Sequence, residues 1–482
     1  MNTAVFPKIN NEKFYNWLFA GLIVVFIGLK FSDLFLPYFW DELGVYSQCA
    51  VYQFHNGISL MPSSLPPELS RGHPLFFTFC NAINMQLFGT KVVAAHAFNL
   101  LVAVLLLCAV YTYMSKHFNR LVAFVSVLLL AAQPLFIAQS ALVVPEVMLS
   151  LLLVLSLFNY YEERYLLSGI FGALALLTKE SAIVLPVVLI TYSVFQFLFF
   201  KNRQAAFRPF NLLFTIIPYI VFGVFLLIQK QQNGWYFFPY HISGMSFDIK
   251  EALECFNDFF GFVTWSQGRY WWMKFMLIAP VVALFTNRFT IRSLNNSLVL
   301  LMLLFCTAFL LFSALNFYME RYVVVVVVFV AALTAISIVE IFKKKYFVAI
   351  VAVFLVVVAM GHYEEGKFNN DFDMGYRHNV IAVKKAVDYC SERLGNDELM
   401  YGNFPAYFAI NFLEGGYYKP HQKQIMGAMN FKDNTRYFIY SEPGNFCEVD
   451  QTRFSDTLVA TFTSGYARAY VHRLSTKQVI LN

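Results

Sequence analysis

The stretch that decides the fold comprises residues 17–42, WLFAGLIVVFIGLKFSDLFLPYFWDE. Its first part, 17–36, is apolar over about 20 residues, which is the length that an α-helix needs to cross a bilayer core. This run is too long for the apolar part of a cleavable signal peptide, and no small-residue cleavage site follows it. Two adjacent acids, Asp41 and Glu42, come shortly after it. The stretch therefore predicts a transmembrane helix with a carboxylate pair near one end.

The composition of the whole chain supports a membrane protein. Of 482 residues, 59% are hydrophobic and only 13% are charged, and 55 are Phe. Soluble domains are about 45–50% apolar and about 25% charged. One water-soluble core could not bury this much apolar surface, so a soluble enzyme is excluded. The net charge is +6, but no basic face with interleaved aromatic residues occurs, so nucleic acid is not an expected partner.

Ten further apolar runs follow the first and predict a bundle of about eleven transmembrane helices. Some are short for a full span. The runs are 90–113, 120–141, 146–160, 166–179, 181–199, 210–229, 271–286, 296–315, 322–342 and 346–361.

Clusters of Lys and Arg lie at alternate turns between these runs. Such clusters mark the cytoplasmic side of a membrane protein. They are Lys8 and Lys13; Lys116 and Arg120; Arg164; Lys201, Arg203 and Arg208; Arg288 and Arg292; and Lys343, Lys344 and Lys345. The pattern predicts a cytoplasmic N-terminus, a membrane domain over 1–361 and an extracytoplasmic domain over 362–482.

Two long loops, 37–89 and 230–270, fall on the outer side in this topology. The first contains helical periodicity from Asp41 to His55, which predicts a helix at the membrane interface. A second interfacial helix is expected from Pro74 to Phe88, with Pro in its first turn and an end at Gly89. The functional surface is therefore expected on the outer side.

The tail is predicted to be a small α/β domain. An amphipathic helix is expected near 377–394, and strand-like runs follow at 399–403, 437–440, 458–462 and 467–471. Cys390 and Cys447 both fall in this domain and could form a disulfide in an oxidising compartment. No pair of cysteines has zinc or redox spacing.

Five short motifs carry charge at the outer ends of the runs. Each also has an ordinary structural explanation, such as a helix cap, a first-turn acid, a surface ion pair or a membrane anchor. They are Trp40-Asp41-Glu42; Arg71-Gly72-His73-Pro74; Pro145-Glu146; Thr178-Lys179-Glu180; and Glu320-Arg321-Tyr322. Ionisable groups next to hydrocarbon are costly unless they are paired or used. All five lie on one predicted membrane face, so together they indicate a site.

In this order the motifs resemble those of the GT-C superfamily of polyprenyl-phosphate-sugar glycosyltransferases. The similarity is greatest to the branch with protein O-mannosyltransferases and lipid A aminoarabinose transferases. Residues 40–42 resemble that branch's Asp-Glu motif, and residues 72–77 its His-Pro-Pro-Leu segment, with Leu75 in place of the second Pro. Glu146 stands where the family commonly has Asp. Residues 175–181 and 321–322 resemble its Leu-Thr-Lys-Glu and Arg-Tyr segments.

The resemblance implies an inverting glycosyltransferase, transferring a hexosyl or pentosyl group, at the outer face of a bacterial inner membrane. The sugar donor would be linked to a polyprenyl phosphate, and the acceptor would be a lipid, a glycan or a protein. Asp41 is expected to be the catalytic base, supported by Glu42, while Glu146 orients the acceptor or shares a bound cation. The donor phosphate is expected to meet Arg71, His73, Lys179 and Arg321.

Two other functions stay open at this stage. A transporter or lipid flippase would place charged or broken segments near the middle of the membrane, often in paired halves. Here the ionisable residues lie at the ends of the runs, and no repeat is found. A non-catalytic scaffold would not need acids and cations gathered on one face. No residue spacing demands a metal, so the need for a divalent cation is left open.

Overall fold

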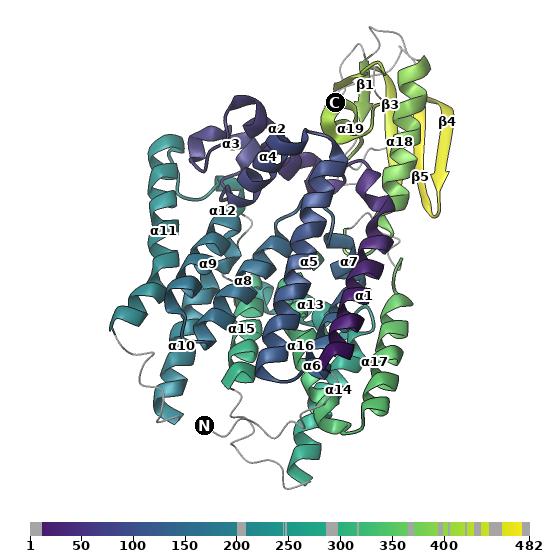
Figure 1. Ribbon diagram of the computed structural model, residues 1–482. Coiled ribbons are helices and arrows are strands. Elements are labelled where there is room, and N and C mark those ends of the chain that lie inside the picture. The colour runs from purple at the N-terminus through teal and green to yellow at the C-terminus, as the bar shows by residue number, and fades with distance from the viewer. Residues whose placement is uncertain are drawn as a thin grey trace.

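The protein is mainly helical, with one small sheet near its C-terminal end (Figure 1). The structure, a computed structural model, describes residues 12–199, 209–243, 245, 248–285, 297–315, 318–364, 371–393, 399–402, 405–419, 422–428, 435–442 and 456–474. Long helices form a bundle, and the short helices α2 to α4 lie at the same end of this bundle as the sheet.

A helix occupies each of the eleven predicted runs. The helices are α1 (Glu12–Lys30), α5 (Val92–His117), α6 (Arg120–Ala131), α7 (Pro134–Gln139), α8 (Glu146–Tyr161), α9 (Tyr165–Thr178), α10 (Val184–Phe199), α11 (Pro209–Asn233), α14 (Arg269–Phe285), α15 (Ser297–Ser313), α16 (Val324–Ile341) and α17 (Lys345–Met360). Among the described residues, five helical segments are long and apolar enough to cross a membrane: Lys13–Phe35, Val92–His117, Glu180–Leu198, Leu213–Asn233 and Glu320–Ile341. The chain is therefore an integral membrane protein, while the count of eleven spans stays a prediction.

The run 120–141 is not one helix. α6 ends at Ala131 and α7 begins at Pro134, because proline lacks an amide hydrogen and its ring clashes with the preceding helical turn. The chain then passes through a buried non-helical segment, and α8 begins at Glu146. This break brings the amino end of α8, with its acid, to the end of the bundle where the short helices lie.

The predicted interfacial helices are present. A π-helical turn, η2 (Glu42–Tyr46), continues into α2 (Ser47–Asn56), and α4 (Phe76–Phe88) ends at Gly89, whose φ is 84°. The expectation that Pro74 lies in the first turn of α4 is wrong, since the helix begins only after Leu75.

The loop 230–270 is partly helical, since it contains α12 and α13. The remaining elements are η1 (Ser32–Phe35), η3 (Pro62–Ser64), α3 (Pro67–Ser70), η4 (Glu180–Ile183), α12 (Pro239–Ser243), α13 (Ile249–Trp265), η6 (Glu320–Val323) and η7 (Leu413–Gly415).

The C-terminal region is the predicted α/β unit. α18 (Tyr376–Arg393) packs on a five-stranded sheet of order β2-β1-β3-β5-β4, in which β1 is parallel to β2 and β3 and the other pairs are antiparallel. The strands are β1 (Leu399–Gly402), β2 (Met426–Ala428), β3 (Thr435–Glu442), β4 (Asp456–Ser464) and β5 (Ala467–Leu474), and α19 (Ala406–Asn411) follows β1. The sequence missed β2 and α19 because both are very short. Cys447 lies outside the described residues, so the disulfide stays a prediction.

The sheet region is tied to the chain that follows α1. The Tyr38 amide donates to the Gly415 carbonyl at 2.9 Å, and the Tyr417 hydroxyl donates to the Tyr38 carbonyl at 3.0 Å. Arg377 of α18 lies 3.2 Å from the Asp33 carboxylate. The segment that leads into Asp41 is therefore held between the bundle and the C-terminal unit.

Candidate active site

Arg321 is the centre of the charged residues at this end of the bundle. Its side chain is only 2% exposed and contacts carboxylates from three distant parts of the chain. One terminal nitrogen binds Asp41, the other lies 2.9 Å from Asp371, and Nε lies 3.2 Å from Glu146 Oε1. A buried guanidinium is stabilised only when such partners satisfy its charge and its donors.

Lys179 extends this cluster. The chain leaves the helical conformation between α9 and η4, and here Lys179 Nζ lies 2.7 Å from Glu146 Oε1 and 3.5 Å from the centre of the Tyr322 ring. Glu146 therefore lies between two cations. We call Asp41, Glu146, Lys179, Arg321 and Asp371 the ion-pair network. Its three carboxylates face two cations.

Glu42 holds the turn that presents Asp41. Its buried carboxylate accepts hydrogen bonds from the Phe39 amide at 3.0 Å and the Val143 amide at 2.7 Å, and it lies 2.6 Å from His96 Nε2. Between these contacts Trp40 adopts a φ of 51°, which is uncommon for a residue with a side chain. Strain of this kind persists only where its surroundings enforce it. Glu42 thus acts on Asp41 through the backbone, because it holds the turn from which Asp41 projects.

The two acids at the outer ends of the network differ in electrostatics. Burial raises the pKa of Asp41, but the charges of Arg321, Arg71 and His73 outweigh this effect and hold that pKa below its ordinary value. Burial raises the pKa of Asp371 above its ordinary value, even though Arg321 opposes the shift. Asp41 is therefore ionised at neutral pH, and Asp371 is the more easily protonated of the two.

Arg71 and His73 lie next to Asp41, and we call this part of the site, which carries the charge of Arg71, the cationic side. Arg71 is half-buried in a left-handed conformation after α3, and no acid pairs with its guanidinium among the residues that the structure describes. His73 Nδ1 lies 2.9 Å from Glu180, and its ring centre lies 4.7 Å from that of His241. Burial and His73 lower the pKa of His241 to about 4, so this ring is neutral at pH 7. Among the described cations of this site, Arg71 is thus the one whose charge is least compensated by acids.

The structure brings most of the predicted site residues together. Asp41, Glu146, Lys179 and Arg321 join one network, whereas Glu42 faces the backbone and His96. Their catalytic and binding roles stay predictions. The sequence analysis missed Asp371, which lies beyond the last apolar run and in no recognised motif. Only its place shortly after that run, where the chain returns to the bundle, could have suggested it.

Comparison with known proteins identifies the architecture. The sequence model of the dolichyl-phosphate-mannose-protein mannosyltransferase family matches residues 72–217. ArnT from Cupriavidus metallidurans in the apo state superposes with a TM-score of 0.57 at 13% identity, covering 95% of this chain and 98% of that chain. The chain has the GT-C fold. This is the fold that the resemblance of the motifs implied.

Two further GT-C structures agree. ArnT bound to undecaprenyl phosphate gives a TM-score of 0.56 at 14% identity, with 95% of this chain and 98% of that chain covered. The Archaeoglobus fulgidus oligosaccharyltransferase in complex with Zn and sulfate gives 0.53 at 12% identity, with 87% and 67% covered. No curated protein sequence matches the chain significantly.

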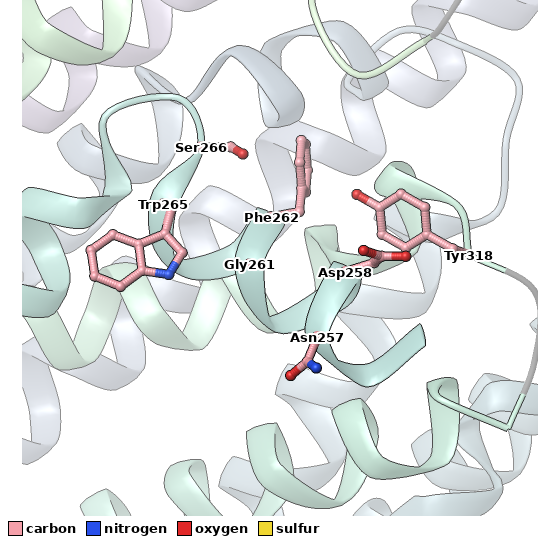
Figure 2. A pocket seen from close by; sticks show the side chains of 7 residues that line it. All are labelled: Asn257, Asp258, Gly261, Phe262, Trp265, Ser266 and Tyr318. Atoms are coloured by element: carbon pink, nitrogen blue, oxygen red, sulfur yellow. The ribbon is translucent and has the colours of Figure 1, made fainter. Parts of the chain in front are cut away.

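An open groove of about 360 Å³ lies beside the network of this GT-C chain (Figure 2). One wall is the face of α13 that carries Asp258 and Phe262, and the facing wall is Tyr318, three residues before Arg321. Figure 2 shows the Asp258 carboxylate next to the ring of Tyr318. Polar and aromatic groups thus converge next to the site.

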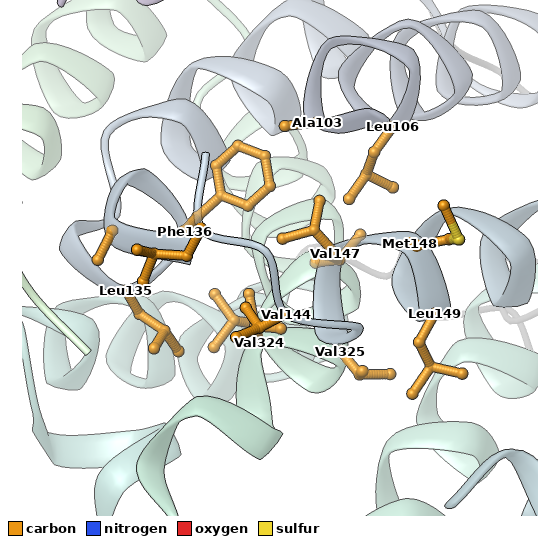
Figure 3. Packing of buried hydrophobic residues seen from close by; sticks show 14 of the residues in the cluster. Ala103, Leu106, Leu135, Phe136, Val144, Val147, Met148, Leu149, Val324 and Val325 are labelled. Atoms are coloured by element: carbon orange, nitrogen blue, oxygen red, sulfur yellow. The ribbon is translucent and has the colours of Figure 1, made fainter. Parts of the chain in front are cut away.

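Four buried valines adjoin residues of the network in the sequence. Val144 and Val147 flank Glu146 in the sequence, Val324 and Val325 follow Arg321, and all four are at most 3% exposed. Figure 3 shows them gathered near Phe136 of α7. Such surroundings keep water away and strengthen every charge interaction above them.

The described residues do not form an evident metal site. No group of three or more His, Cys, Asp or Glu side chains that could hold an ion occurs among them. Asp41 and Glu146, which were considered as partners of a shared cation, both contact Arg321, and the shared cation stays a prediction. Their negative charge is already compensated by a side chain.

Proposed function

We propose that this chain is a membrane glycosyltransferase that moves a sugar from a polyprenyl-phosphate donor to an acceptor at the outer face of a bacterial inner membrane, with inversion. In this orientation the N-terminus is cytoplasmic and the C-terminal unit is extracytoplasmic. The observation that carries the proposal is the convergence of Asp41, Glu146, Lys179 and Arg321 in one buried network. The GT-C fold supports it.

The donor phosphate would bind on the cationic side. Among the described residues no acid pairs with Arg71, so its guanidinium can meet an anion without first losing an ion pair from this part of the chain, and His73 lies two residues on. Lys179 and Arg321 would each bind the phosphate in place of a carboxylate that they contact now. These cations stabilise the negative charge that develops on the leaving phosphate. Undecaprenyl phosphate binding by a protein of the same fold favours this donor class.

Asp41 is the proposed base. As the bond between the anomeric carbon and the phosphate oxygen breaks, the phosphate leaves with the electron pair, and the acceptor oxygen forms the new bond from the other face. The acceptor proton passes to the Asp41 carboxylate. Glu146 would keep Lys179 and Arg321 in place, because it lies between them.

The test uses purified protein and synthetic undecaprenyl-phosphate-linked hexoses and pentoses. Asp41→Asn should lower turnover by about 10²–10⁴-fold, which is the usual contribution of a general base, while the melting temperature stays near that of the wild type. Asp388→Asn is the control, since Asp388 lies on α18 and its carboxylate is 3.9 Å from Lys384 of the same helix. Wild-type turnover by Asp41→Asn would refute the base assignment. Movement of the intact donor across liposomes without sugar release would instead favour a flippase.

A further inference from the structure

The groove between α13 and Tyr318 has the chemistry of a sugar site. Its lining offers an amide, a carboxylate and two hydroxyls from Asn257, Asp258, Ser266 and Tyr318, together with the ring of Trp265. Amide and carboxylate groups bind vicinal hydroxyls in pairs, and an aromatic ring packs against the CH groups of a pyranose. The volume of about 360 Å³ falls within the range of about 300–1,000 Å³ for small-molecule sites.

The groove is connected to the ion-pair network through one pair of packed rings. Phe262, which lines the groove, packs edge-on against Phe372, with ring centres 5.6 Å apart, and Phe372 follows Asp371 directly. Two buried amides fix this part of the chain. Gln267 donates to the Phe372 carbonyl at 2.9 Å, and Gln139 donates to the Asp371 carbonyl at 2.6 Å. A molecule in the groove would therefore contact Phe262, which packs on the residue that follows Asp371.

Charge is distributed unevenly around Arg321. The cationic side, with Arg71 and His73, belongs to the chain between α3 and α4. The groove side carries the acids Asp258 and Glu320 against the cation Arg269, whose guanidinium lies 4.9 Å from the centre of the Phe262 ring. An anionic phosphate is favoured by the first environment and disfavoured by the second. A neutral hydroxyl compound carries no such penalty beside the acids, and carboxylates accept its hydrogen bonds.

We propose that this groove binds the acceptor of the transfer and that the acceptor is a carbohydrate. The inference rests on the proposed function and adds the acceptor class. A lipid chain fits less well, because four hydrogen-bonding side chains line the groove. The acceptor hydroxyl oxygen forms the new bond to the anomeric carbon, its proton goes to Asp41, and polyprenyl phosphate leaves with the electrons of the broken bond.

The experiment measures sugar binding by the full chain in detergent, using saturation-transfer NMR. The probes are the methyl glycosides of glucose, galactose, mannose and N-acetylglucosamine. At least one should bind, and Trp265→Ala and Asn257→Ala should each weaken its binding by about tenfold. Trp17→Ala is the matched control, since Trp17 is an exposed tryptophan of α1, 76% exposed against 65% for Trp265.

A second measurement, the thermal shift caused by undecaprenyl phosphate, separates the two proposals. If this lipid stabilises the protein but no glycoside binds, the acceptor assignment is overturned and the proposed function stands. Glycoside binding that is unchanged in both groove variants also overturns it, as does binding of a serine-containing peptide in the groove in place of the glycosides. Absence of any lipid effect counts against the proposed function itself.

Discussion

Replacing Asp371 by Asn should tighten the binding of undecaprenyl phosphate. Asp371 occupies one terminal nitrogen of Arg321 at 2.9 Å and adds a third carboxylate to a network with two cations. The amide of Asn keeps the shape and can still accept a hydrogen bond from Arg321, but the negative charge is gone. A bound phosphate is then repelled by one carboxylate fewer, and the charge of Arg321 is compensated by fewer acids and attracts the phosphate more strongly.

The size of the effect follows from the geometry. Two unit charges about 4 Å apart near a protein surface interact by about 4 kcal/mol. Arg321 already compensates much of the Asp371 charge, so about a third of this repulsion should reach the phosphate. That third is about 1.4 kcal/mol, which corresponds to about a tenfold gain in affinity.

The assay is titration of purified protein with undecaprenyl phosphate between pH 5 and 8. Because the pKa of Asp371 is raised above its ordinary value, the folded protein takes up a proton at Asp371 as the pH falls through that pKa, and the neutral side chain no longer repels a bound phosphate. Wild-type affinity should therefore rise toward acid pH more than that of Asp371→Asn. The comparison cancels the titration of the phosphate itself. Asp373→Asn is the control, since Asp373 Oδ1 accepts a hydrogen bond from the Gly375 amide, whereas Asp371 binds Arg321. Equal or weaker binding by Asp371→Asn would refute the reasoning.

Two further predictions concern Lys179 and Glu42. Lys179→Ala should weaken undecaprenyl phosphate binding and lower the free energy of unfolding by about 3–5 kcal/mol, because it removes one partner of a buried ion pair. Lipid titration measures the affinity and calorimetry the stability. Unchanged lipid affinity would exclude Lys179 from the phosphate site. Glu42→Ala should lower stability by about 1–3 kcal/mol, since it leaves the amides of Phe39 and Val143 unsatisfied, and Glu42→Gln should recover part of the loss. If Glu42→Ala melts like the wild type, the clamp does not hold the strained turn at Trp40.

The membrane bundle was accessible from the sequence because its signal is local. An apolar run of the right length predicts a helix wherever its neighbours lie, so every run contains a helix. The break before Pro134 was missed because the apolar run continues through it. Proline breaks the helix through its missing amide hydrogen, which a hydrophobicity pattern does not reveal. The interfacial helix around Asp41 was likewise found from periodicity, but its π-helical start was not.

The sequence by itself determined that this is a membrane protein and that acids and cations stand at the ends of its helices. The order of these motifs also predicted the GT-C fold. Only the tertiary structure decided which charges pair. Arg321 contacts residues that are 280, 175 and 50 positions away in the chain, and no local pattern encodes such distances. Asp371 also binds Arg321, because a buried guanidinium is stabilised by carboxylates that the packing places within contact distance.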